Sequence, residues 1–301
     1  MGGADVKGMT CRICPRGCGV DRAERTGYCG MPDEIFVARC APHTWEEPPI
    51  SGTRGSGTVF FSGCNLRCVF CQNHVISHER RGRAVTEDKL LDMLMALADT
   101  GVHNVNLVTP THYTPQLVRV LEKIKPHLHI PIVWNSSGYE RTESLSMLDG
   151  LVDIYLPDFK YVSSELSSAY SGAPDYAEVA GAAILTMMRQ VGRVQLDADG
   201  IMMRGMIVRH LVLPGCRKDS IAVVNRLAEL LPAEEFKLSL MRQYTPEFAS
   251  ACPYSNLHRR VTDFEYRSVV DEAMRLGLDG YTQGKDAATS DYTPHFEWAE
   301  P

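Results

Sequence analysis

The segment Gly63-Cys64-Asn65-Leu66-Arg67-Cys68-Val69-Phe70-Cys71-Gln72-Asn73 places three cysteines on one short loop in C-x3-C-x2-C spacing. Three thiolates at this spacing can hold three irons of a cubane iron–sulfur cluster. No fourth cysteine lies nearby, so the fourth iron would keep an open position, as reactive metals do and closed structural sites do not. The segment therefore predicts a substrate-binding cluster, with a set of zinc ligands or a chance grouping as the alternatives.

Around this loop, short apolar strands alternate with amphipathic helices. The run 58–61 precedes the cysteines, and further strands are expected at 105–108, 130–134, 152–156, 206–213 and 236–241, with 279–281 as a candidate seventh. Helices are expected at 86–98, 115–125, 143–148, 176–191, 220–231 and 264–276. Nearly continuous apolar strands that alternate with helices are typical of a parallel sheet covered on both faces. The pattern favours an α/β partial (β/α)6 barrel, and a doubly wound open sheet has the same local signature.

The expected organisation has three parts. Residues 1–50 form a cysteine-rich N-terminal metal-binding extension with its linker, because the Pro/Gly-rich stretch 48–57 follows five clustered cysteines. Residues 51–285 form the partial barrel. Residues 286–301 form a C-terminal tail without hydrophobic periodicity.

Composition excludes several classes of protein. The chain has 301 residues, of which 44% are hydrophobic and 23% charged, so it has enough apolar material for a sizeable core and is not disordered. A net charge of −6 disfavours non-specific nucleic-acid binding, which needs a basic surface. There is no apolar run of membrane-spanning length and no signal-peptide core. We therefore expect a soluble cytoplasmic protein that binds neither membranes nor nucleic acid.

The cysteine motif, with an aromatic residue before its last cysteine and a strand before its first, resembles that of the radical S-adenosylmethionine (SAM) superfamily. The resemblance covers residues 58 to 248 and is closest to the pyruvate formate-lyase activating enzyme-like branch, and within it to PflX-like proteins. It implies a [4Fe-4S] cluster held by Cys64, Cys68 and Cys71, SAM on the open iron, and an adenine contact by Phe70. It also implies an electron donor such as flavodoxin or ferredoxin.

Other unusual polar groups fall where the expected strands end. Thr109–His112, Asn135-Ser136, Asp158 with Lys160, Arg209, and Gln243-Tyr244 follow or end five successive strands. The carboxyl ends of parallel barrel strands share one rim, so these groups are expected around a single cavity with the cysteine loop.

The resemblance gives roles to several of them. Thr109 stands where the family has a Gly-Gly-Glu segment that binds the amino group of SAM, although this sequence lacks those residues. Asn135 and Ser136 match a segment near the ribose and, in some activating enzymes, near a monovalent cation. Asp158 and Lys160 match an Asp-x-Lys motif that lines the active site. Arg209 matches an arginine that pairs with a carboxylate of SAM.

Structural alternatives accompany these roles. Asp158 and Lys160 share one face of a strand and could form a simple ion pair, and Arg209 could serve a structural salt bridge. Arg209 and His210 should point to opposite faces, so they are not both expected in the site. His112 could act as a general acid or base or make a structural hydrogen bond.

A second cysteine set lies near the N-terminus. Cys11, Cys14, Cys18 and Cys29 have the spacing C-x2-C-x3-C-x10-C, and Cys40 could substitute for one of them. Four thiolates can close a tetrahedral zinc site or hold an auxiliary iron–sulfur cluster, and the sequence does not choose between them.

The resemblance therefore implies a radical SAM oxidoreductase of the activating-enzyme type. Such an enzyme cleaves SAM reductively to a 5′-deoxyadenosyl radical, which abstracts hydrogen from a glycine of a partner protein. Radical modification of another peptide or of a small molecule is an alternative. A non-catalytic iron–sulfur or zinc scaffold or electron relay is a further one, and it would leave SAM uncleaved.

Overall fold

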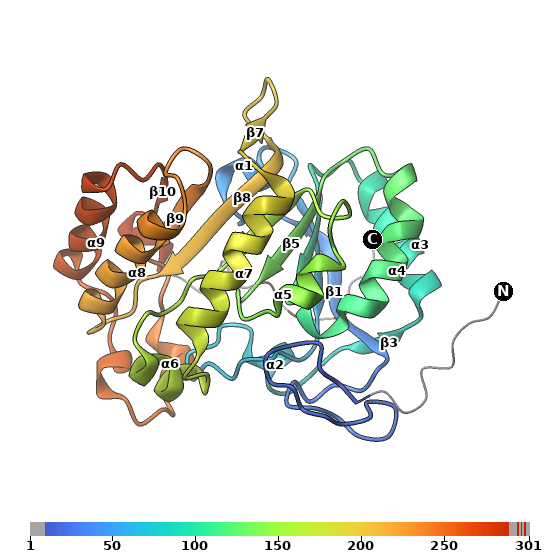
Figure 1. The fold of residues 1–301 in the computed structure, drawn as a ribbon, viewed down its shortest axis with the longest axis horizontal. Coiled ribbons are helices and arrows are strands. Elements are labelled where there is room, and N and C mark those ends of the chain that lie inside the picture. The colour runs from blue at the N-terminus through green and yellow to red at the C-terminus, as the bar shows by residue number, and fades with distance from the viewer. Residues whose placement is uncertain (1–9, 289–293, 295, 297, 299–301) are drawn as a thin grey trace.

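The computed structural model describes residues 10–288, 294, 296 and 298. Its centre is a run of parallel strands (Figure 1): β2 (Ser56–Phe61), β4 (Val105–Val108), β5 (Ile132–Ser136), β6 (Ile154–Pro157), β8 (Met202–Leu211), β9 (Lys237–Met241) and β10 (Gly280–Thr282). The sheet order is β10-β9-β8-β6-β5-β4-β2-β1-β3. The six expected strands are confirmed, and the candidate seventh is β10.

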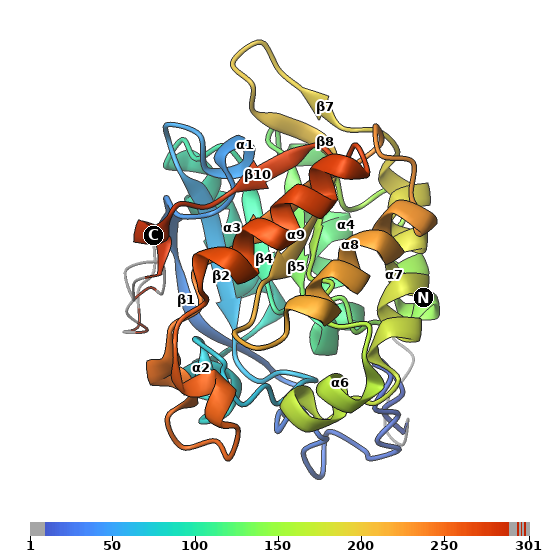
Figure 2. The ribbon, with the colours of Figure 1, turned by 90° about the vertical axis from the view of Figure 1, so that its left-hand side faces the viewer.

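Helices connect successive parallel strands and cover the outside of the sheet (Figures 1 and 2): α3 (Glu87–Asp99), α4 (Thr114–Ile124), α5 (Thr142–Ser146), α7 (Tyr176–Val191), α8 (Arg217–Leu230) and α9 (Asp263–Arg275). The short helix α6 (Ser164–Ser171) lies at the end of the strands, on the side of α2. Local sequence fixes where some of the helices begin. The hydroxyl of Thr86 accepts a hydrogen bond from the backbone N–H of Lys89 at the start of α3. Thr262 and Glu265 form a reciprocal capping box at the start of α9. The predicted α/β partial barrel is confirmed.

Two antiparallel strands extend the sheet beyond β2. β1 (Ile35–His43) pairs with β2, and β3 (Arg83–Val85) pairs with β1. β1 therefore belongs to the barrel sheet, although it lies on the N-terminal side of the predicted boundary at residue 50. The expected linker 48–57 contains α1 (Pro48–Ser51) and the start of β2.

The remaining elements are short. β7 (Gln195–Leu196) forms a hairpin with β8, and α2 (His74–Ser77) follows the cysteine loop. Single 3-10 turns occupy residues 111–113, 125–127, 246–249, 255–258 and 285–287. Figures 1 and 2 show α1 and the β7 hairpin at one end of the strands, with α2 and the N-terminal segment at the other.

Alternation along the strands separates the packed core from the interior of the barrel. Outward residues of the strands, such as Phe61, Leu107 and Trp134, are fully buried in the main core between sheet and helices. Near the amino ends of the strands, a smaller apolar cluster fills the interior and includes Ile50, Val133, Ile154, Leu156, Met202 and Ile207. Polar side chains that include Asn135, Asp158 and Arg209 line the rest of the interior, which holds the site described below.

The N-terminal segment packs directly on the cysteine loop. Arg16 donates hydrogen bonds to the backbone carbonyls of Asn65 (2.8 Å) and Gly172 (2.5 Å), and its guanidinium lies 3.9 Å from the ring centroid of Tyr28. Gly63 has φ +82°, and a Cβ there would lie 2.8 Å from the carbonyl oxygen of Cys29. Glycine is therefore required where the two segments meet.

Most of the predicted C-terminal tail, namely residues 289–293, 295, 297 and 299–301, lies outside the described residues. Within the part of the chain that the structure describes, no helix combines the length and apolar character needed to cross a membrane.

Candidate active site

The three cysteines of the C-x3-C-x2-C loop each have a hydrogen-bond partner at sulfur. The backbone N–H of Leu66 lies 3.3 Å from Cys64 Sγ, and the Ser171 hydroxyl donates to Cys68 Sγ at 3.0 Å. Cys71 Sγ lies 3.2 Å from the hydroxyl of Ser77. The partners thus come from the cysteine loop itself and from the last residues of α6 and α2. Donors aimed at sulfur are the partners that metal-bound thiolates require.

Two of these thiols, those of Cys64 and Cys71, are costly to ionise without a metal. Burial, with the neighbouring Cys68, raises the pKa of Cys71 to about 11 and raises that of Cys64 above its ordinary value. The ammonium of Lys160 acts in the opposite direction on both pKa values. A cationic metal cluster would replace the missing countercharge, so the donor set and its surroundings fit a cluster.

A site for a single metal ion has different requirements from a site for a cluster. Over the described residues, no group of three or more His, Cys, Asp or Glu side chains is arranged to hold one metal ion. A cubane cluster binds each cysteine through a different iron, so its ligands need not converge on one point.

One cavity of about 580 Å³ brings the cysteine loop and the predicted polar residues together. Cys68, Phe70 and Cys71 line one part of it. The inward side chains of the strands line its wall: Asn135, Asp158, Lys160 and Arg209. The fold therefore places these strand-end residues around one cavity with the cysteine loop, as the sequence predicted. Phe70 is 7% exposed and packs edge-on against Tyr170 and Tyr244.

Arg209 is the centre of a buried polar network in this cavity. Its Nε lies 3.0 Å from Asp158 Oδ1, and a terminal nitrogen donates to Asn135 Oδ1 at 2.7 Å. A second terminal nitrogen lies 3.5 Å from Glu46 Oε2. The guanidinium thus joins β5, β6 and β8 through their inward ends and forms the salt bridge that was the alternative to a ligand contact. His210 points to the opposite face, as expected, where its Nδ1 lies 2.8 Å from the carbonyl oxygen of Phe159.

Asp158 and Lys160 form an ion pair that lines the cavity, with Nζ 2.5 Å from Oδ2. Their side chains are only 13% and 18% exposed. Burial acts to raise the pKa of Asp158, but Arg209 and Lys160 outweigh it, so the pKa lies below its ordinary value. The carboxylate therefore stays ionised between two cations.

Thr109 has an unusual backbone conformation for a β-branched residue. Its φ is +60°, and its N–H donates to the carbonyl oxygen of Asn135 at 2.8 Å. This left-handed conformation costs a non-glycine residue roughly 1–2 kcal/mol. The position thus keeps a conformation that glycine adopts readily, although the family's glycines are replaced here.

Ser136 turns away from the cavity. Its hydroxyl donates to Glu140 at 2.6 Å, and Glu140 also accepts from Trp134 Nε1 at 2.9 Å and Thr111 Oγ1 at 3.0 Å. The buried carboxylate of Glu140 therefore ties the loop after β4 to the loop after β5. Sequence reasoning did not single out Glu140, which lies four residues beyond the end of its strand.

His112 is also outside the cavity lining. Its Nε2 lies 2.8 Å from the carbonyl oxygen of Ser62, and Arg22 donates to the backbone carbonyl oxygen of His112. Burial, with the nearby Arg22, lowers the pKa of His112 to about 3, so the imidazole is neutral at pH 7. His112 therefore makes a structural hydrogen bond, which was the alternative to a role as general acid or base. Gln243 lines the cavity, whereas Tyr244 donates to the carbonyl oxygen of Leu257 at 2.6 Å.

Glu46 is a cavity residue that the sequence did not reveal. It lies in the loop between β1 and α1, is separated from Arg209 by 163 positions, and has a side chain only 9% exposed. Burial raises its pKa to about 7, against the opposing effect of Arg209. The signal in the sequence is weak: two adjacent acids follow an aromatic residue directly before a proline pair.

The four N-terminal cysteines lie close to one another. Burial and the charges of Cys29, Cys11 and Cys18 raise the pKa of Cys14 to about 11. Cys18 Sγ accepts a hydrogen bond from the backbone N–H of Tyr28 at 3.2 Å. Cys40 is fully buried within β1. Among the described residues the four cysteines are not arranged to hold a single metal ion, so the predicted metal site stays a prediction.

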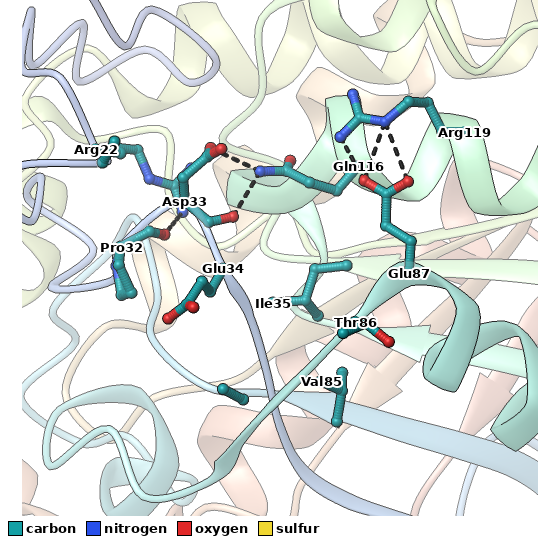
Figure 3. Close-up of a pocket in the computed structure, with 12 residues that line it drawn as sticks. Arg22, Pro32, Asp33, Glu34, Ile35, Val85, Thr86, Glu87, Gln116 and Arg119 are labelled. Carbon is teal, nitrogen blue, oxygen red and sulfur yellow. Dashed lines mark hydrogen bonds and ion pairs between the residues drawn. The ribbon is translucent and has the colours of Figure 1, made fainter. Parts of the chain in front are cut away.

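A second cavity, of about 620 Å³, lies between the N-terminal segment, the edge strand β3 and the starts of α3 and α4 (Figure 3). Its charged groups satisfy one another: Arg119 Nε lies 3.0 Å from Glu87 Oε1, and Gln116 donates to Asp33 Oδ1 at 2.7 Å. No cysteine lines it. The cavity at the cysteine loop is therefore the candidate active site.

The chain is similar to several known proteins. It is 27% identical over 281 residues to the uncharacterized protein MJ0674 of Methanocaldococcus jannaschii, covering 89% of this chain and 75% of that one. Among solved structures, a mutant of spore photoproduct lyase has a TM-score of 0.51 at 11% identity, covering 81% of this chain and 82% of that one. A domain of pyruvate-formate lyase-activating enzyme from Bacteroides vulgatus has a TM-score of 0.40 at 15% identity, covering 57% of this chain and 92% of that one.

The family comparison agrees with the position of the cysteine loop. Residues 58–190 match the model of the radical SAM superfamily, and this span runs from β2 to the end of α7. It contains the three loop cysteines and, among the residues that line the cavity, Asn135, Asp158 and Lys160. Residues 58–190 are therefore similar to the radical SAM superfamily.

Proposed function

We propose that this protein is an enzyme that binds a [4Fe-4S] cluster through Cys64, Cys68 and Cys71 and cleaves SAM reductively to abstract hydrogen from a substrate. One observation carries the proposal: the cysteine loop opens into the same cavity of about 580 Å³ as Asp158, Lys160 and Arg209. When bound, the cluster supplies an electron and an open iron for SAM, which yields the 5′-deoxyadenosyl radical.

The chain's own residues then bind and orient SAM. Phe70 lines the cavity between two of the cysteines and offers an apolar face for the adenine. Asn135 and Arg209 offer polar contacts on the opposite wall. Asp158 and Lys160 hold a fixed pair of charges beside them.

The proposed substrate is a glycine of a partner protein, as in activating enzymes. The Asp-x-Lys match at Asp158 and Lys160 supports this choice through the resemblance to activating enzymes. The proposed electron donor is a small acidic carrier such as flavodoxin or ferredoxin.

The N-terminal cysteines are proposed to hold a second metal. Cys11, Cys14, Cys18 and Cys29 offer four thiols. Burial, with the neighbouring cysteines, raises the pKa of Cys14 and of Cys29, and coordination removes this cost. A variant that lacks the cluster at Cys64, Cys68 and Cys71 allows the metal at the N-terminal cysteines to be measured by itself. In a Cys68→Ala variant, one equivalent of zinc would identify a zinc site, and residual iron with equal sulfide would identify an auxiliary cluster.

The direct test is anaerobic reconstitution with iron and sulfide, reduction with dithionite, and chromatography of the products formed from SAM. The wild type should form 5′-deoxyadenosine and methionine. The Cys68→Ala variant should form neither. The matched control is Cys252→Ala, because Cys252 lies outside both cysteine sets, and it should behave as the wild type. Undiminished cleavage by Cys68→Ala would contradict the proposal.

A further inference from the structure

The loop between β1 and α1 closes the cavity from the side opposite the cysteine loop. β1 is antiparallel to β2, so its carboxyl end lies where β2 begins, and Figures 1 and 2 show α1 at the opposite end of the strands from α2. From there, His43, Thr44, Trp45, Glu46, Glu47 and Pro48 all line the cavity. This loop is the floor of the site.

The two acids of the floor are buried with too few hydrogen-bond donors. Glu46 has contacts of 3.3 and 3.4 Å from Asn135 Nδ2 and of 3.5 Å from Arg209. Charge-assisted hydrogen bonds are normally about 2.7–2.9 Å long. Glu47 is 8% exposed, and within the described structure its Oε2 has no hydrogen-bond partner.

A neighbouring amide is unsatisfied as well. Asn106, on β4, is fully buried and lies close enough to Glu46 to stabilise its ionised form. Neither polar atom of its side chain has a hydrogen-bond partner at ordinary distance among the described residues. Buried polar groups without partners are rare and costly, so these groups together indicate a missing ligand.

The charges of the cavity give the sign of that ligand. Three carboxylates, Glu46, Glu47 and Asp158, face two cations, Lys160 and Arg209. Both cations bind Asp158 at 3.0 Å or less, and Arg209 lies at the longer distance of 3.5 Å from Glu46, so one negative charge is left in excess at the floor. Trp45 and Tyr281 line the same part of the cavity and offer aromatic faces, which favour organic cations.

We infer that Glu46 and Glu47 recognise a positively charged amino group on the substrate. The inference rests on the proposed function, because it names the substrate class of the same cavity. An ammonium group donates three hydrogen bonds, enough to serve both Glu46 and the unpartnered Glu47 Oε2. It would bind at the floor and leave the rest of the substrate directed towards the cysteine loop.

The test uses the reconstituted full-length protein and two probes of similar shape, n-butylammonium chloride and 1-butanol. Isothermal titration at pH 8 and constant ionic strength should show at least tenfold tighter binding of the cation. Glu46→Gln should weaken its binding at least tenfold, and Glu47→Gln should weaken it in the same direction. Glu34→Gln, a change at an exposed acid outside this cavity, should leave binding unchanged.

Equal binding of the two probes, or of the cation to wild type and a folded Glu46→Gln variant, would overturn the inference. Near-ultraviolet circular dichroism checks that the variants fold. Titration needs no turnover, so its result is independent of SAM cleavage. Amine binding without SAM cleavage would support this inference and contradict the proposed function. SAM cleavage without selective binding of the amine would support the proposed function and contradict this inference.

Discussion

The hydroxyl of Ser171 donates a hydrogen bond to the sulfur of Cys68 at 3.0 Å. Ser171 is the last residue of α6, so a helix distant in sequence sets the electrostatic surroundings of the cysteine loop. Hydrogen bonds to cluster sulfurs stabilise the more negative, reduced state and raise the reduction potential.

Removing this donor should lower the potential. We expect Ser171→Ala to shift the midpoint of the reconstituted cluster by about 50 mV to more negative values, which corresponds to about 1 kcal/mol for one electron. A redox titration followed by electron paramagnetic resonance (EPR) measures the shift. Ser268→Ala, on the exposed face of α9, is the control and should leave the midpoint in place. An unchanged midpoint in Ser171→Ala would show that the hydroxyl has no influence on the cluster.

Arg209 predicts how the enzyme responds to monovalent cations. The segment at Asn135 resembles one that lies near such a cation in some activating enzymes, but here a guanidinium nitrogen already lies 2.7 Å from Asn135 Oδ1. A fixed internal cation removes the need for a bound one. Rates of SAM cleavage in sodium, potassium and tetramethylammonium chloride should agree within twofold at equal ionic strength. A tenfold preference for one of these salts would contradict this account.

Asp158 should be important for stability, because it is shared by two buried cations. Breaking a buried pair costs about 3–5 kcal/mol, so Asp158→Asn should lower the free energy of unfolding by about 3 kcal/mol. Urea denaturation measures this loss. Asp88→Asn removes an exposed pair with Lys123 and should change the free energy by less than about 0.5 kcal/mol.

The contribution of Asp158 also depends on pH. Its pKa is depressed in the folded state, so the stabilisation is complete above the ordinary pKa of about 4 and is lost as the pH falls below it. The difference between Asp158→Asn and the wild type should therefore shrink in acid. A difference that persists unchanged below pH 4 would mean that the ionised carboxylate is not its source.

Glu46 predicts the opposite pH dependence. Its pKa rises from an ordinary 4.5 to about 7 in the fold, so the unfolded chain ionises first and folding loses stability between these two pH values. The charged groups around it are Arg209, Glu47 and Asp158. Between pH 5 and pH 8, Glu46→Gln should gain about 2.5 kcal/mol relative to wild type in urea denaturation. A gain that is the same at both pH values would disprove the raised pKa.

The sequence predicted the barrel because its strands and helices have strong local signals. The runs 105–108 and 236–241 became β4 and β9, and the cysteine loop followed the first parallel strand as expected. It did not predict β1, whose residues show no clear alternation of burial and which pairs only through β2 and β3. Pairing of this kind depends on the tertiary fold rather than on local pattern.

Site residues at the ends of strands could be predicted from the sequence. Site residues on loops and helices that are distant in sequence could not. Asn135, Asp158 and Arg209 could be placed in one cavity because parallel strands share a rim. Glu46 and Ser171 reach the same region from a loop and a helix that are distant in sequence. Ser136 was expected near the ligand, but its hydroxyl turns to Glu140, because a buried carboxylate competes for donors.

The most direct measurement of the central claim is the EPR spectrum of the reduced, reconstituted protein before and after addition of SAM. Three cysteines leave one iron without a protein ligand, so SAM should bind there and change the g-values of the spectrum, while Cys68→Ala should give no such signal. A [4Fe-4S] spectrum that stays identical at saturating SAM would contradict the account.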